Sequence, residues 1–148
     1  MLLEKNALDK IRPVPVQPGG AATALPMAVL VNGGTSSGAE IVAGALQDAH
    51  RAKLVGEKTF GTGTVLQTFP LSDGSALMLA IEEWLTPDGH VIWHHGITPD
   101  VLISLPPEVT PLSPVTEREL TPEELRKSGD VQLLRALDLL LQEKQQST

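Results

Sequence analysis

The sequence predicts a mixed α/β fold, and the first indication is a strand–helix–strand pattern. Two short apolar runs, residues 27–31 and 52–55, each stop at glycine-containing turns, as strands buried in a parallel sheet do. Between them, residues 38–49 place apolar side chains at helical spacing. Three such elements within about 30 residues form a βαβ unit with a right-handed crossover. We expect the helix to pack between two strands of one sheet.

The second indication is a change to a period of two after residue 63. We interpret the runs that follow as strands, and turns containing glycine separate them. Strands are expected at residues 64–69, 76–85, 90–94 and 101–105, with turns at 72–74 and 86–89. The chain is therefore expected to continue as β-hairpins after the βαβ unit.

Proline-rich segments lie on both sides of this α/β region. Residues 1–26 contain several prolines and a Gly-Gly pair, which predict an extended arm or short strand followed by a loop. Residues 106–116 carry four prolines and predict an irregular loop. We therefore divide the chain into an arm at 1–26, an α/β core at 27–105, and a loop with helices at 106–148.

Two helices are predicted near the carboxy-terminal end. Thr121, Pro122 and Glu124 supply an N-cap, a proline at the first helical position and a capping-box acid. Asp130 caps a second helix, expected from about 131 to 144. The leucines that repeat along one face of this helix are Leu133, Leu134, Leu137, Leu140 and Leu141. We expect this face to dock on the core or, if the core is incomplete, on another copy or a partner chain.

Composition excludes several functions. A net charge of -7 argues against a nucleic-acid-binding face, which would be basic. The chain has no cysteine, so disulfides, zinc–thiolate sites and a cysteine nucleophile are excluded. No apolar run reaches the roughly 18 residues that a membrane span needs, and the first residues lack a secretory apolar region. No cofactor or metal is expected, because adjacent His94 and His95 would point to opposite faces of a strand.

The turn after the first buried strand is the place where chemistry is expected. In open α/β sheets, ligands bind at the carboxyl ends of the strands. Here Asn32, Gly33 and Gly34 lead to Ser37, which stands before the helix. Ser37 and Glu40 have capping-box spacing, so the serine is either a helix cap or an exposed nucleophile beside oxyanion-binding N–H groups. The residues alone favour the cap, which is the commoner role.

The stretch from Met27 to Asp100 resembles the C-terminal processing, or tail-specific, peptidases. These are serine peptidases with a Ser–Lys dyad and a crotonase-like (ClpP/crotonase) layered core. The motifs that carry the resemblance are Val31-Asn32, T-S-S-G-A-E-I at 35–41, Gln47-Asp48, Arg51-Ala52, G-E-K-T-F-G-T-G at 56–63, L-S-D-G-S-A-L at 71–77 and G-I-T-P-D at 96–100.

The resemblance implies roles for particular residues. It implies that Ser37 is the nucleophile, that the N–H of Gly38 supplies one oxyanion donor, and that Asp48 is the helix-end acid that supports the site. At the position of the family's catalytic lysine this chain has Thr62. Lys58 is a weak candidate for a substitute base. The other titratable candidates, for which surface or core roles are expected, are His50, His90, His94 and His95.

The threonine at position 62 sets the functional expectation. A Ser–Lys dyad depends on a neutral lysine that takes the serine proton, and threonine has no group that titrates near neutral pH. The upstream strands and glycine-rich turn of the family, and its PDZ domain, are not recognisable in residues 1–31. We therefore expect a fragment or a reduced relative that hydrolyses peptides very slowly or not at all.

Three functions remain open at this point. The first is a serine-type peptidase that cuts proteins near apolar carboxyl termini, with protein or peptide tails as partners. The second is an inactive homologue that acts as a peptide-binding or assembly module. The third, an acyl-CoA enzyme on a crotonase-like fold, is disfavoured because no adenine-binding pattern accompanies the peptidase motifs. The resemblance also implies an extracytoplasmic location, in the periplasm or cell envelope.

Overall fold

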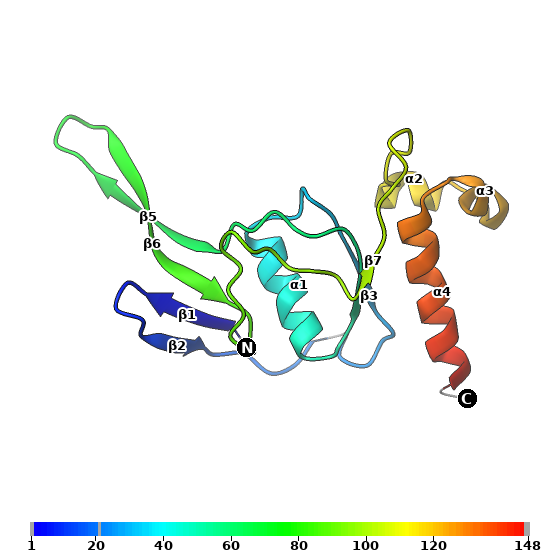
Figure 1. Ribbon diagram of the computed structural model, residues 1–148, viewed down its shortest axis with the longest axis horizontal. Coiled ribbons are helices and arrows are strands. Elements are labelled where there is room, and N and C mark those ends of the chain that lie inside the picture. The colour runs from blue at the N-terminus through cyan, green and yellow to red at the C-terminus, as the bar shows by residue number, and fades with distance from the viewer. Residues whose placement is uncertain (1, 21, 147–148) are drawn as a thin grey trace.

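The protein is described by a computed structural model covering residues 2–20 and 22–146, which form two sheets and several helices (Figure 1). One sheet is antiparallel with strand order β2-β1-β6-β5, and the other is parallel with order β3-β4-β7. The strands are β1 (Leu2–Asn6), β2 (Ile11–Val14), β3 (Ala28–Val31), β4 (Lys53–Gly56), β5 (Thr64–Pro70), β6 (Ala76–Leu85) and β7 (Val101–Leu102). The helices are α1 (Gly38–Asp48), α2 (Pro114–Arg118), α3 (Pro122–Lys127) and α4 (Val131–Gln146).

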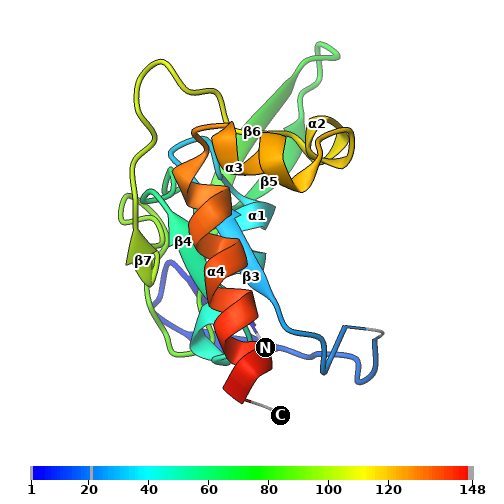
Figure 2. The same ribbon diagram turned by 90° about the vertical axis from the view of Figure 1, so that its right-hand side faces the viewer.

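The predicted βαβ unit is confirmed. Strands β3 and β4 pair in parallel, from Ala28 opposite Lys53 to Val31 opposite Gly56, and α1 lies between them in the sequence. Helix α1 covers one face of this sheet, and α4 crosses β3 and β4 on the other face (Figures 1 and 2). The parallel sheet is therefore enclosed between two helices, which explains its continuous apolar runs.

One apolar cluster joins the parallel sheet to α1 and to the loop after β6. Its buried members are Val31, Ala43, Leu54, Ile92 and Ile97. Trp84 of β6 packs against the cluster, so the antiparallel sheet is tied to the same core. The buried members of this cluster are all aliphatic.

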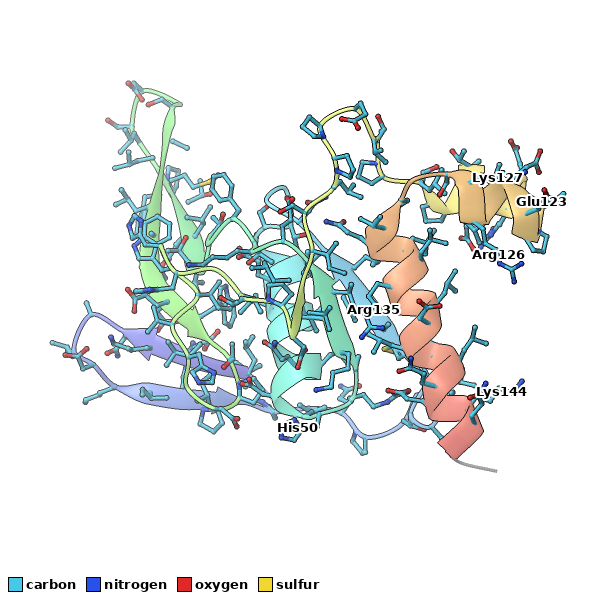
Figure 3. The ribbon with its side chains drawn as sticks, turned by 45° about the vertical axis from the view of Figure 1, so that its right-hand side comes forward. His50, Glu123, Arg126, Lys127, Arg135 and Lys144 are labelled. Atoms are coloured by element: carbon cyan, nitrogen blue, oxygen red, sulfur yellow. The ribbon has the colours of Figure 1, made fainter. Side chains whose placement is uncertain are left out.

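Helix α4 docks on its own chain, as the leucine pattern predicted. Ala136 and Gln132 are buried, and the Gln132 amide donates to the carbonyl of Ile103 at 2.7 Å. Asp130 caps the helix by accepting from the N–H of Leu133 at 2.9 Å. Most of the leucine face is half-buried, whereas Leu141 stays 58% exposed. Charged residues Glu123, Arg126 and Lys127 of the neighbouring α3 point outward (Figure 3).

Three segments differ from the sequence-based expectation. Residues 2–14, expected as an arm, contain β1 and β2, and β1 pairs with β6. The expected strand at 101–105 is only the two residues of β7. Helix α2 lies inside the expected loop at 106–116 and beyond it, capped by the Ser113 hydroxyl with a proline in its first turn. A proline at a helix start is compatible with the helix, so the proline count was a misleading signal there.

The predicted strand at 90–94 was wrong. Only Val91 forms a bridge, to Leu85, and the chain then turns, with His94 at φ 60°. The backbone passes so close to Gly63 that a Cβ there would lie 2.6 Å from the Cβ of Ile92. Residues 90–94 therefore turn at this close approach and do not extend as a strand. Ile92 is fully buried there.

A buried carboxylate connects α1 to the loop that follows β4. Glu40 has no exposed surface, and its two oxygens accept four hydrogen bonds. One oxygen accepts from the Thr59 hydroxyl at 2.5 Å and from the Gly61 N–H at 2.7 Å. The other accepts from the N–H groups of Thr62 at 2.8 Å and Ser37 at 3.0 Å. All four partners donate, which suits a carboxylate because it only accepts.

Asp100 performs a similar role at the other end of α1. Its carboxylate accepts from the N–H of Leu54 at 2.9 Å, from Lys53 at 3.1 Å and from the Gln47 amide at 3.2 Å. Partial burial raises the pKa of Asp100, but these hydrogen bonds and the Lys53 charge outweigh it, so the pKa lies below its ordinary value. The last residue of the G-I-T-P-D motif therefore anchors β4 to α1.

We predict that Glu40→Gln lowers the free energy of unfolding by about 2–3 kcal/mol, because an amide NH₂ would face backbone donors and leave a buried group unsatisfied. Urea denaturation monitored by circular dichroism measures this change. The matched control is Glu108→Gln at an exposed position, which should change stability by less than about 0.5 kcal/mol. Equal effects of the two substitutions would contradict the role assigned to Glu40.

We predict that Asp100→Asn destabilises the protein by about 1 kcal/mol at pH 7. Since the folded-state pKa of Asp100 is lowered, its stabilisation is present above the unfolded pKa, near 3.8, and is lost as the pH falls through the folded pKa. The difference between wild type and variant should therefore shrink below pH 3.8. Asp138→Asn, at an exposed position on α4, is the control. A difference independent of pH would contradict this account.

Candidate functional site

The turn between β3 and α1 is closed by its own hydrogen bonds. The Asn32 side chain accepts from the N–H of Gly34 at 2.9 Å, and the Asn32 N–H donates to the Thr35 hydroxyl at 3.0 Å. The carbonyl of Thr35 also accepts from the N–H of Phe60 at 2.9 Å. The turn at the carboxyl end of β3 is thus fixed both internally and to the loop after β4.

Ser37 occupies the end of this turn in a strained backbone conformation. It is the N-cap residue of α1, with φ 54° and ψ -122°, and it is exposed. Residues with a side chain rarely adopt such angles, and they persist only where the surrounding structure enforces them. A sharp, strained turn from a strand into a helix is also how the α/β-hydrolases, a different fold, expose a serine nucleophile.

The structure brings positions 37 and 62 together, although 25 residues separate them in the sequence. Their backbone N–H groups donate to the same oxygen of Glu40, at 3.0 and 2.8 Å. The two nitrogens are therefore within about 6 Å of each other. The side chain of Thr62 is half-buried. The capping-box spacing of Ser37 and Glu40 had predicted the contact of Glu40 with Ser37, but not its contact with Thr62.

Asp48 is not close to Ser37. The two residues lie at opposite ends of α1, about 16 Å apart along the helix axis. The Asp48 carboxylate accepts from the N–H of Asp88 at 2.8 Å and lies 3.6 Å from the His90 ring nitrogen. It therefore holds the turn after β6 against the end of α1. If Asp48 supports the site, it would do so by fixing the position of α1, not by contacting Ser37.

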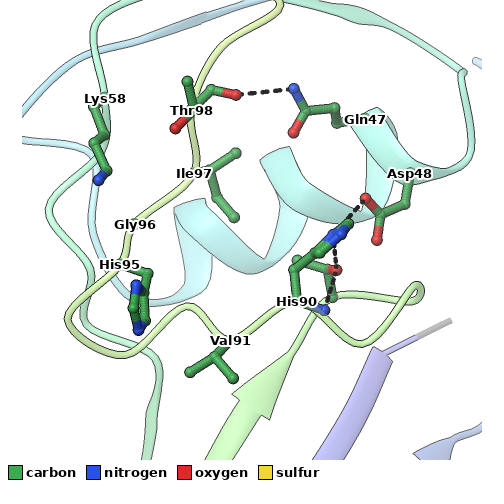
Figure 4. Close-up of a pocket in the computed structure, with 10 residues that line it drawn as sticks. Gln47, Asp48, Lys58, His90, Val91, His95, Gly96, Ile97 and Thr98 are labelled. Carbon is green, nitrogen blue, oxygen red and sulfur yellow. Dashed lines mark hydrogen bonds and ion pairs between the residues drawn. The ribbon is translucent and has the colours of Figure 1, made fainter.

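Lys58 lines a cavity that Ser37 does not border. This cavity, of about 510 Å³, lies beside the carboxyl end of α1. Figure 4 shows Lys58 and His95 on one side of it and Asp48 with His90 on the other. Lys58 is exposed and has no ion-pair partner among residues 2–20 and 22–146. The structure thus places Lys58 and Asp48 on one cavity, and Ser37 is not among the residues that line it.

The remaining candidates lie on the surface. His50, His90, His94 and His95 are all exposed. His50 lies just beyond the carboxyl end of α1 (Figure 3), at the opposite end of the helix from Ser37. Within the described part of the chain, no group of three or more His, Asp or Glu side chains is arranged to hold a metal ion. Among the same residues, no helix is both long and apolar enough to cross a membrane.

The motif G-I-T-P-D has a structural explanation. Gly96 has φ 62°, and a Cβ there would lie 2.4 Å from the carbonyl oxygen of Thr59. This contact lets the N–H of Ile97 donate to the Thr59 hydroxyl at 2.7 Å, and that hydroxyl donates in turn to Glu40. The motif therefore supports the loop that carries position 62.

Known proteins with similar sequences are carboxyl-terminal-processing proteases. The protease of Synechocystis sp. is 44% identical over 122 residues, which are 82% of this chain and 26% of the relative. The protease of Picosynechococcus sp. is 42% identical over 125 residues, 84% of this chain and 27% of the relative. The chain thus spans about a quarter of the length of these relatives.

The fold is also that of a solved protease. The structure of the photosystem II D1 C-terminal processing protease superposes with a TM-score of 0.67 at 37% identity, over 78% of this chain and 29% of that one. The profile of Peptidase family S41 matches residues 4–103, which is more than half of the chain. The chain therefore belongs to Peptidase family S41, the family of these C-terminal processing serine proteases.

Proposed function

We propose that this chain carries the nucleophile turn of a crotonase-like serine peptidase that acts on protein tails with apolar carboxyl termini. The observation that carries the proposal is the strained, exposed Ser37 at the start of α1. In the proposed reaction the Ser37 hydroxyl attacks the scissile carbonyl, and its proton passes to a base. The N–H of Gly38, in the first turn of α1, would bind the developing oxyanion.

The proposed activity of the chain as it stands is slow, because its site lacks an evident base. Thr62 cannot accept a proton near neutral pH. Glu40 is buried, and its two oxygens already accept four hydrogen bonds from the protein, so we do not assign it as the base. Lys58 faces a cavity that Ser37 does not line. Asp48 has a proposed positioning role only, since it secures the far end of the helix that begins after Ser37.

A second function has its own supporting observation. The backbone of position 62 is held in place while its side chain has lost basicity, and this is expected of an inactive homologue that still binds peptides. The two functions are separated by combining a binding assay with a fluorophosphonate probe. Labelling of wild type but not of Ser37→Ala supports the peptidase, whereas peptide binding without labelling or turnover supports the binding module.

The family resemblance extends the proposal to cellular location. We place the protein outside the cytoplasm, in the periplasm or cell envelope, where the tails of exported proteins would be its substrates. Cell fractionation followed by immunoblotting tests this location. Detection only in the cytoplasmic fraction would reject it without bearing on the chemistry of Ser37.

We predict that Thr62→Lys raises the rate of hydrolysis of an apolar-tailed peptide by about 10²-fold or more. A general base typically contributes about 10²–10⁴-fold, and the Glu40 contact holds the backbone of position 62 whatever its side chain. Release of a fluorogenic group measures the rate.

The control for this gain is the double variant Ser37→Ala with Thr62→Lys, which should return to the uncatalysed rate. Since loss of one oxyanion donor costs about 10²–10³-fold, the gain will be partial if that donor comes from a longer parent protein. A gain that survives Ser37→Ala, or no gain at all in a folded variant, would contradict the assigned pair of positions.

We predict that Lys58→Ala leaves the rate of the Thr62→Lys variant within about 2-fold, because Lys58 lines a cavity apart from Ser37. The same assay measures this, and Lys10→Ala, at an exposed position, is the control. If wild type hydrolyses the peptide robustly and both Ser37→Ala and Lys58→Ala abolish that turnover, Lys58 is the base and this assignment is wrong.

A further inference from the structure

The two asparagines of the chain lie in turns with similar hydrogen bonds. Asn6 ends β1, and Asn32 follows β3. Each side-chain oxygen accepts from the N–H two residues further on, at 3.0 Å for Asn6 and 2.9 Å for Asn32. Each main-chain carbonyl accepts from the N–H three residues further on, again at 3.0 and 2.9 Å. The Asn6 side chain also accepts from the N–H of Lys10 at 3.1 Å. Both asparagines are thus held in the same kind of turn.

The turns differ in the residue that follows the asparagine. Asn32 is followed by Gly33, and Asn6 is followed by Ala7. Within residues 2–20 and 22–146, neither of these following residues donates its N–H to an acceptor. Gly33 has no side chain to cover its nitrogen, and both Gly33 and Asn32 are exposed. The Gly33 nitrogen is therefore accessible, and so is the amide beside it.

An asparagine side chain can be attacked by the backbone nitrogen that follows it. That nitrogen loses its proton to a base in the solvent and bonds to the side-chain carbon Cγ. The bond from Cγ to the side-chain nitrogen breaks, and ammonia leaves with a proton from the solvent. Water then opens the resulting succinimide ring at either carbonyl, so the net change is uptake of water and loss of ammonia. A side chain on the following residue hinders the attack, and glycine hinders it least.

We propose that Asn32 is a site of spontaneous deamidation in the turn that leads to Ser37. As the Gly33 nitrogen attacks, negative charge develops on the Asn32 side-chain oxygen, to which the N–H of Gly34 already donates. A donor aimed at a developing oxyanion lowers the barrier. Asn6 has the same assistance, so the residue after the asparagine decides which turn reacts. Asparagine is in general one of the thermolabile residues.

The two products of the reaction affect the turn differently. Aspartate at position 32 keeps the oxygen that accepts from the N–H of Gly34. In isoaspartate the main chain passes through Cβ and Cγ, so it is longer by one carbon, and the carbonyl that accepts from Thr35 is displaced. The strained backbone of Ser37 persists only while this turn enforces it. If the proposed function is correct, isoaspartate formation therefore inactivates the nucleophile as the protein ages.

Exchanging the residues that follow the asparagines tests the proposal. Wild type, Gly33→Ala and Ala7→Gly are incubated at mildly alkaline pH, and peptide mapping by mass spectrometry follows the conversion of amide to acid. In wild type, position 32 should convert while position 6 stays intact. Gly33→Ala should slow conversion at position 32 at least several-fold, and Ala7→Gly should introduce conversion at position 6.

Both variants are expected to fold. A Cβ at Gly33 would meet no heavy atom within 4 Å, and the φ of Gly33 does not lie in the left-handed region. Ala7 is exposed, so removal of its methyl group leaves no cavity. Circular dichroism verifies the fold, and a sample of wild type unfolded in urea gives the rate of conversion without the turn.

Two results would overturn the proposal. Equal conversion at position 32 in wild type and in Gly33→Ala would show that the glycine does not direct the reaction. An intact Asn32 in the folded chain, over a time in which the unfolded chain converts, would show that the turn protects the amide.

The consequence for the serine has a separate readout. Fluorophosphonate labelling of Ser37 should fall during incubation of wild type in proportion to its isoaspartate, and it should fall at least several-fold more slowly in Gly33→Ala. An isoaspartyl-specific methyltransferase measures the isoaspartate. Absence of labelling in fresh protein would contradict the proposed function, whereas the masses at positions 6 and 32 decide the modification site without any peptidase activity.

Discussion

The buried carboxylate of Glu40 is the constraint on which the rest of the site depends. It joins the first turn of α1 to the loop after β4 through four hydrogen bonds, two of them to the backbone of positions 37 and 62. A carboxylate removed from water is stable only when such donors surround it, so the two segments cannot separate without a large loss of free energy. The strained backbone of Ser37 is maintained by the same arrangement.

The contact between Glu40 and position 62 is made through a backbone N–H, so the geometry of this loop does not depend on the side chain at that position. Glu40 binds the N–H of residue 62, which every residue type except proline provides. The threonine side chain therefore contributes little to the position of the backbone at residue 62, from which a lysine would extend in the Thr62→Lys variant. A substitution at position 62 should therefore leave the fold unchanged. The Thr62→Lys variant then tests whether the rest of the proposed site is in place.

The sequence predicted those elements whose periodicity was strong. The βαβ unit and α4 follow from spacing, because their apolar residues pack into the core. The β5–β6 hairpin was predicted from its glycine-containing turn, and most of its side chains are exposed on both faces. The segment at 90–94 was wrong because its conformation depends on a close approach to Gly63 that no local pattern reports. Of the candidate site residues, Ser37 and Thr62 lie together, while Asp48 and Lys58 line opposite sides of a cavity that does not include them. Which of these residues lie together depends on the tertiary fold. The spacing along α1 could predict only that Asp48 lies far from Ser37.

The motifs that identify the family are mostly structural in this chain. Glu40 and Thr59 hold the loop at 59–62, and Gly96 and Asp100 hold the segment that packs beneath it. A match at these positions is therefore strong support for the fold and weaker support for the activity. Thr62, which we propose stands at the position of the catalytic lysine, contributes its backbone N–H to these hydrogen bonds. Membership of the family and competence in its chemistry are consequently two different questions for this chain, and the second depends on the base and on the oxyanion donors available to Ser37.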